Sequence, residues 1–124
     1  MRSSHMAILS AKPSERYAWT NHAYFKMKQY RLSESLVKRV IRYPARIEQG
    51  ILEDAIAVMR PASASMLRRG EPAKAKNYSE IWAMYVTTKR GQLRIITAWR
   101  YPGRSPERDP IPAEILEEVR KILF

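Results

Sequence analysis

The chain has 124 residues, 45% of them apolar and 28% charged, which is enough for one domain with a modest core. It has no cysteine and no uninterrupted apolar run of about 18 residues, which excludes disulfides, thiolate metal sites and a membrane-spanning helix. Its 23 Lys and Arg residues outnumber 12 Asp and Glu residues, and the net charge of +11 favours polyanionic partners such as RNA. We expect a cytoplasmic protein.

The chain divides into three parts. Residues 1–6 are typical of an expression-tag remnant and are set aside, which leaves His22 as the one histidine of the remaining sequence. Residues 7–19 show no clear hydrophobic period and predict a loose N-terminal arm. Residues 20–124 are predicted to form a single domain.

Two helices are predicted at the start of this domain. Thr20 is placed to cap a short helix over residues 22–31. Ser33 is placed to cap a second helix, in which Glu34 complements the positive N-terminal end. Pro44 disfavours helical geometry in the residue before it and should end this second helix.

The hydrophobic period changes after Pro44. Segments 45–51 and 55–59 are compatible with short strands. Segments 81–87 and 93–99 are rich in apolar, β-branched and aromatic residues, as central strands are. Residues 61–77 show little periodicity and predict a long exposed loop.

A C-terminal helix is predicted after Pro112, with acids in its first half, bases in its last turn and an apolar stripe along one side. The order of elements predicts an α+β fold. Two N-terminal helices would pack on a small, mainly antiparallel sheet of three or four strands, together with the C-terminal helix.

The positive charge is concentrated in three segments. Residues 22–46 carry seven bases against one acid, residues 60–76 five against one, and residues 89–108 six against one. A solvated basic surface that keeps the protein soluble would explain this pattern. A phosphate-binding face assembled from the three segments would explain it equally.

Metal and cofactor chemistry find little support in the sequence. One histidine and no cysteine cannot build a zinc site, and no phosphate-binding loop, dinucleotide motif or nucleophile elbow is present. We expect no metal and no cofactor. The chemistry that these residues could still support is metal-free cleavage of RNA, in which the 2′-OH of the RNA attacks the adjacent phosphate. This reaction needs a base to remove the 2′-OH proton and cations to stabilise the charged phosphorane.

A candidate for such a site lies on the first predicted helix. His22, Lys26 and Tyr30 are spaced four residues apart, so they share one helix face. An imidazole can accept the 2′-OH proton near neutral pH, and a lysine one turn away can hold the phosphate and lower the imidazole pKa. Spacing alone also allows His22 merely to start the helix, with Lys26 solvated.

The motif His22-x3-Lys26-Met27, followed by Arg31-Leu32-Ser33 and later by the strand residues 95–99, resembles a bacterial domain family. That family opens with His-x3-Arg/Lys-Met, continues with a Leu/Ile-Ser/Thr helix start, and closes with a strand bearing Thr or Ser. It is related to the BrnT and RelE toxins, within the barnase–EndoU–colicin–RelE group of metal-independent ribonucleases. The resemblance covers residues 20–101.

The resemblance implies a catalytic site of His22, Lys26 and Thr97, with Thr97 facing the first helix from the last strand. We expect the Thr97 side chain to share a face with Leu93, Ile95 and Trp99. Substrate would be bound by residues of the two helices and of the last strand. These are Arg31, Lys38, Arg39, Arg42, Trp99, Arg100 and Tyr101.

The aromatic residues allow two interpretations. Trp82 and Tyr85, on a predicted central strand, are expected in the core. Trp99 and Tyr101, beside Arg100 and Arg104, could stack on unpaired bases or pack against the C-terminal helix.

The sequence therefore predicts a metal-independent endoribonuclease, the toxin of a toxin–antitoxin pair with an acidic antitoxin as its protein partner. The alternative is a non-catalytic RNA-binding or partner-binding module with the same fold. Both predict RNA binding that weakens with salt, but only the first predicts cleavage in EDTA.

Overall fold

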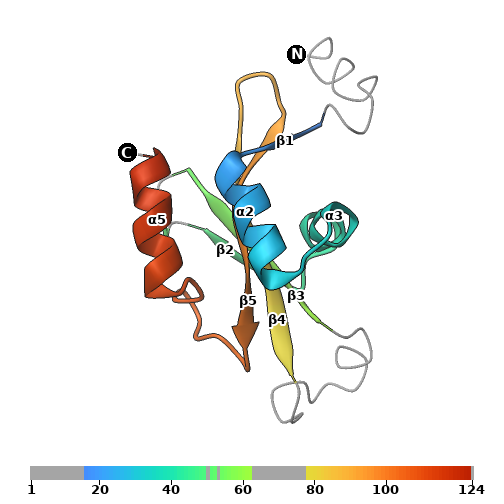
Figure 1. The fold of residues 1–124 in the computed structure, drawn as a ribbon, viewed down its shortest axis with the longest axis vertical. Helices are drawn as coiled ribbons and strands as arrows, with labels where there is room; N and C mark the ends of the chain where they lie inside the picture. Colours follow the sequence, from blue (N-terminus) through green and yellow to red (C-terminus); the bar gives the residue numbers. More distant parts are fainter. Residues whose placement is uncertain (1–15, 50, 53, 63–77, 124) are drawn as a thin grey trace.

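The computed structural model describes residues 16–49, 51–52, 54–62 and 78–123. They form an α+β fold in which helices pack on a five-stranded sheet of order β1-β5-β4-β3-β2 (Figure 1). The strands are β1 (Tyr17–Trp19), β2 (Arg46–Gln49), β3 (Ile56–Pro61), β4 (Ser79–Thr87) and β5 (Leu93–Pro102). The helices are α2 (Asn21–Tyr30), α3 (Glu34–Arg42) and α5 (Ala113–Leu123).

The two N-terminal helices begin and end as their capping residues predict. The Thr20 hydroxyl accepts a hydrogen bond from the Ala23 amide at the start of α2, and the Ser33 hydroxyl accepts one from the Leu36 amide at the start of α3. Helix α3 ends at Arg42, and Tyr43, directly before Pro44, is not helical, as predicted. The predicted C-terminal helix is also confirmed.

The sheet is larger than the sequence predicts, because the N-terminal arm contributes a strand. Within the predicted loose arm, β1 pairs in parallel with β5, so the prediction of three or four mainly antiparallel strands is corrected to five strands with one parallel pair. Three residues are too few to show a period of two. The remainder of the arm before residue 16 and most of the predicted 61–77 loop lie outside the described residues.

A register shift in β5 changes which side chains share a face. Thr97 pairs with Met84, whereas Ile95 pairs with Tyr85, so Ile96 is an extra residue in β5. Ile95 consequently packs in the core beneath α2 and α3, while Trp99 packs in the core beside α5. The prediction that Thr97 shares a face with Ile95 is therefore wrong, because the bulge reverses the alternation between them.

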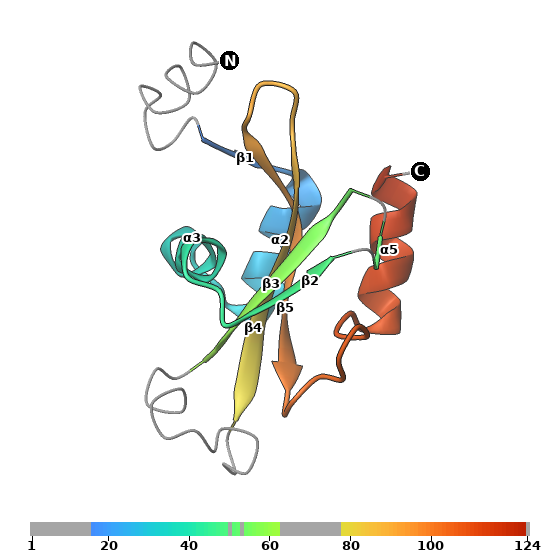
Figure 2. The same ribbon diagram turned by 180° about the vertical axis from the view of Figure 1, so that it is seen from behind.

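The two faces of the sheet carry separate cores. Alternate residues of β4 divide between them: Ile81 and Ala83 join Met27 and Val40 of the N-terminal helices, and Trp82 joins the residues that pack against α5. The Trp82 and Trp99 rings stack with their centroids 5.7 Å apart and their planes 2° apart. Both are fully buried, which confirms Trp82 as a core residue. Figure 2 shows the sheet from behind, with α2 behind the strands, α3 to their left and α5 to their right.

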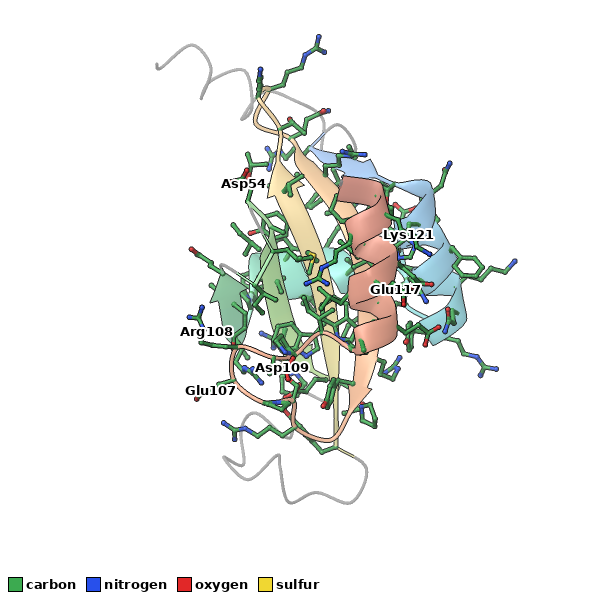
Figure 3. The ribbon with its side chains drawn as sticks, turned by 90° about the vertical axis from the view of Figure 1, so that its left-hand side faces the viewer. Asp54, Glu107, Arg108, Asp109, Glu117 and Lys121 are labelled. Carbon is green, nitrogen blue, oxygen red and sulfur yellow. The ribbon has the colours of Figure 1, made fainter. Side chains whose placement is uncertain are left out.

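A buried network of five residues, the Glu80 network, ties the segment between β5 and α5 to the sheet. It consists of Arg46, Glu48, Tyr78, Glu80 and Ser105. The Glu80 carboxylate accepts hydrogen bonds from the Tyr78 hydroxyl, the Trp82 indole and the Ser105 amide, and it lies 3.6 Å from the Arg46 guanidinium. Arg108, labelled in Figure 3, donates its amide to Glu48 at 3.0 Å, which holds the same segment against β2.

The network also affects the Tyr78 hydroxyl. Burial, followed by the negative charge of Glu80, raises the pKa of Tyr78 to about 12. The phenol therefore stays protonated and can donate to Glu80 well above neutral pH.

Within the described part of the chain, no helix is long and apolar enough to cross a membrane.

Candidate active site

The first and last helices meet in a polar cluster, the α2–α5 cluster, made of His22, Lys26, Gln29 and Glu118. The Lys26 ammonium lies 2.8 Å from the Glu118 carboxylate and donates a hydrogen bond to Gln29 Oε1 at 3.2 Å. His22 Nε2 lies 3.9 Å from the same Glu118 oxygen. Figures 1 and 3 show α2 and α5 side by side, so residues from opposite ends of the domain form one site.

Local sequence explains why α2 presents these groups. Helix α2 contains no acidic residue, and its inner side buries Ala23 and Met27 in the core. His22 and Lys26 lie one turn apart beside these buried residues, and their side chains point towards α5. Lys26 is only 1% exposed, so its charge requires a partner, which Glu118 provides.

His22 has the properties of a neutral base. Its side chain is 15% exposed, and Nε2 is buried without a hydrogen-bond partner among the residues that the structure describes. Burial lowers the pKa of His22 from 6.5; Glu118 opposes this effect and Lys26 adds to it. The imidazole is therefore neutral at pH 7. Because Nε2 is buried, Nδ1 is the ring nitrogen left to accept a proton from a substrate.

The lowered pKa of His22 predicts the position of the acid limb of activity. A base acts only when neutral, so kcat/KM should fall with an apparent pKa below 6.5 as pH decreases. Because Glu118 raises the His22 pKa and Lys26 lowers it, Glu118→Gln should move this limb to still lower pH. The free energy of unfolding should also decrease as pH falls below about 6.5, because the His22 side chain takes up a proton more readily in the unfolded chain than in the folded one. A pH–rate profile checks this; an acid limb above 6.5 would contradict it.

The structure corrects the expected role of Lys26. Its ammonium is enclosed and contacts Glu118 and Gln29, so it does not face a substrate phosphate. The two residues lie one helical turn apart, as predicted, but the observed contact of the Lys26 ammonium is with the Glu118 carboxylate. Lys26 is thus a positioning residue in this site.

The structure also corrects the expected role of Thr97. Its side chain is fully buried, and its hydroxyl has no hydrogen-bond partner within the described ranges, so no substrate atom can reach it. The bulge in β5 turns this residue to the side of Met84.

Replacement of Thr97 provides a direct check. Thr97→Val keeps the shape of the side chain and removes an unpaired buried hydroxyl, so unfolding should cost as much free energy as in the parent or about 1 kcal/mol more. RNA cleavage should not change. Thermal melts and cleavage rates measure both, and a loss of cleavage in a well-folded Thr97→Val protein would restore the catalytic assignment.

The predicted binding residues of β5 are partly occupied by structural contacts. Trp99 is buried against Trp82, and its indole donates a hydrogen bond to the Pro110 carbonyl. Of its two predicted roles, packing in the core beside α5 is therefore correct, and stacking on an unpaired base is not. Arg100 donates to the Tyr30 carbonyl at 3.3 Å at the end of α2. Tyr101 is half-buried beside the α5 core, which leaves part of its ring accessible.

The predicted binding residues of the helices lie at the surface. Arg31, Arg39 and Arg42 are exposed, and the Lys38 ammonium lies 5.2 Å from the centre of the Tyr17 ring. Arg31 follows α2 with a left-handed φ of 58°. Nine residues separate it from His22, roughly 14 Å of helix rise, so the two contact different parts of any bound strand.

Two functional candidates were missed by sequence analysis. Glu118 lies next to the apolar stripe of α5, but only the fold shows that this side meets α2. Arg94 is exposed and, with Trp19 and Asn21, lines an open hollow of about 330 Å³ beside the start of α2. Unlike the enclosed Lys26, it is a cation that solvent can reach.

We compared the chain with protein-family models, curated protein sequences and solved structures, and none of them matches it. Among the described residues, no group of three or more His, Cys, Asp or Glu side chains is placed to hold a metal ion. The resemblance to the toxin-related family therefore stays a prediction that rests on the His22-x3-Lys26-Met27 motif.

Proposed function

We propose that the protein is a metal-independent endoribonuclease in which His22 is the general base. The observation that carries this proposal is the neutral, partly exposed imidazole whose Nε2 faces the Glu118 carboxylate. The negative charge of Glu118, 3.9 Å from Nε2, would stabilise the imidazolium that forms when the ring takes a proton.

The reaction follows from these groups. His22 Nδ1 removes the proton from a ribose 2′-OH, and the 2′ oxygen attacks the adjacent phosphorus. The bond from phosphorus to the 5′ oxygen breaks, giving a 2′,3′-cyclic phosphate. The 5′ oxygen takes a proton from water, and the hydroxide that remains removes the proton from the His22 imidazolium. Arg94, the cation that lines the hollow beside the start of α2, would stabilise the negative phosphorane.

Charge distribution supports RNA as the substrate. The basic helix face, made of Lys28, Arg31, Lys38, Arg39 and Arg42, lies on α2, α3 and their connection, where Glu34 is the one acid in residues 20–45. By contrast, α5 carries three acids and two bases. The basic helix face thus offers a polyanion a row of cations to bind. An acidic antitoxin covering the basic helix face is part of this proposal.

The experiment that tests this proposal is cleavage of single-stranded RNA in EDTA. The proposed chemistry uses only groups of the chain, so excess chelator should leave the cleavage rate unchanged. Loss of cleavage in EDTA, restored by a divalent cation, would contradict the proposal.

Charge reversal on α3 tests the binding face. The triple replacement Lys38→Glu, Arg39→Glu and Arg42→Glu removes three phosphate contacts, so the slope of log K against log salt should become shallower by about 2. Affinity near 0.1 M salt should fall on the order of 100-fold. The control reverses two bases of α5, Arg120 and Lys121, and should bind RNA nearly as the parent does. Equal losses of binding free energy per reversed charge in the two variants would show that net charge alone governs binding.

A second candidate function is an RNA-binding module without catalysis. It is favoured by the ion pair that withdraws Lys26 from the substrate. The two functions share the basic helix face, and the cleavage assay separates them.

A further inference from the structure

Helix α2 exposes two adjacent aromatic side chains on its outer side. Phe25 is 63% exposed and Tyr24 is 45% exposed, and they are two of the four large apolar side chains that the described residues leave at the surface. Their neighbours along the outer side, Lys28 and Gln29, are also exposed. An apolar ring without a polar atom, open to water on a helix free of acids, is available to an external partner.

Phe25 borders the α2–α5 cluster. The Lys26 ammonium lies 5.8 Å from the centre of the Phe25 ring, so the ring sits against the ion pair with Glu118. His22 precedes Phe25 by three residues, which places the two side chains as neighbours on the helix surface. A planar group stacked on Phe25 would therefore lie within one nucleotide of the His22 imidazole.

The surrounding charge selects the kind of partner. The basic helix face begins at Lys28 and continues to Arg31, so the Phe25 ring lies next to a row of cations. A nucleotide fits this arrangement, because its base can stack on the ring while its phosphates contact the cations. In a duplex the bases are stacked on one another and have no free face. In a single strand an unpaired base can turn out and stack on a side-chain ring.

We propose that Phe25 is the stacking platform for an unpaired base beside the scissile phosphate, so that the substrate is single-stranded RNA. This inference rests on the proposed ribonuclease function and adds its substrate class. The neighbouring Tyr24 ring stacks on Trp19, with their ring centres 5.9 Å apart.

Binding of two labelled RNA probes tests the inference. One probe is a 12-nucleotide single strand, and the other is the same strand annealed to its complement, both titrated at one salt concentration with fluorescence anisotropy. The parent should bind the single strand more tightly. Phe25→Ala should weaken single-strand binding by about 5- to 100-fold, the range for one stacked base, and leave duplex binding unchanged. Phe25→Trp should keep the parent affinity.

The control is Ile47→Ala, which removes an equally exposed apolar side chain from β2 and should bind both probes as the parent does. Parent-like single-strand binding by Phe25→Ala would overturn the inference, and so would equal losses for strand and duplex. Loss of a protein dimer in Phe25→Ala would show that the ring serves contact between chains and would also overturn it. If His22-dependent cleavage persists in any of these cases, only the stacking role fails. Phe25-dependent binding without cleavage would instead support the stacking role and contradict the ribonuclease.

Discussion

The rate of RNA cleavage is expected to fall by about 10²–10⁴-fold in His22→Ala, the usual contribution of a positioned general base. The reason lies in the α2–α5 cluster, where burial keeps the imidazole neutral and encloses Nε2, so that Nδ1 is left as the proton acceptor. RNA affinity should barely change, because a neutral ring adds little attraction for phosphate. Single-turnover rates at saturating protein and separate titrations measure the two quantities.

The control for this variant is Lys121→Ala, on an exposed turn of α5 with its side chain 77% accessible. It should cleave at the parent rate. Cleavage by His22→Ala within a few-fold of the parent would remove His22 from the reaction, and a matching fall in thermal stability would identify its role as structural.

Loss of Glu80 is expected to produce the largest change in stability. Glu80→Ala removes a fully buried carboxylate and leaves the Arg46 guanidinium and the donors from Tyr78, Trp82 and Ser105 without their acceptor. Breaking a buried charged network in this way costs about 3–5 kcal/mol of unfolding free energy. For a domain of this size the melting temperature should fall on the order of 10–20 °C.

The matched control is Glu117→Ala, which removes the acid of the exposed Lys121–Glu117 pair on α5. Such surface pairs contribute little, so its melting temperature should stay within about a degree of the parent. Equal melting of the Glu80→Ala and Glu117→Ala proteins would show that the Glu80 network does not hold the segment after β5.

The elements with local signals were predictable from the sequence. Thr20 and Ser33 cap their helices through bonds to residues three positions ahead, and Pro44 acts on its immediate neighbour. Strand β1 escaped prediction because its pairing with β5 joins distant parts of the chain. The bulge at Ile96 was not predicted either, because residues 95–99 show no alternation of polar and apolar side chains that an extra residue would interrupt.

The candidate site was predictable only in part. The helical spacing of His22 and Lys26 was enough to place them together. Their partner Glu118 depends on how α5 crosses α2, which no local pattern specifies. The burial of Thr97 and Trp99 likewise depends on the bulge and on the core beside α5, and neither is visible in the sequence. Their predicted roles in catalysis and substrate binding rested on their positions in the strand alone.

The most direct measurement of the central claim compares two strands in EDTA. One is a single-stranded RNA, and the other is identical except that 2′-deoxyribose replaces every ribose, which removes the attacking hydroxyl and keeps the phosphates and bases. The parent protein is expected to bind both strands, to cleave only the RNA, and to leave 2′,3′-cyclic phosphate ends. Cleavage of the deoxy strand, or intact RNA under conditions where it is fully bound, would contradict the proposed ribonuclease.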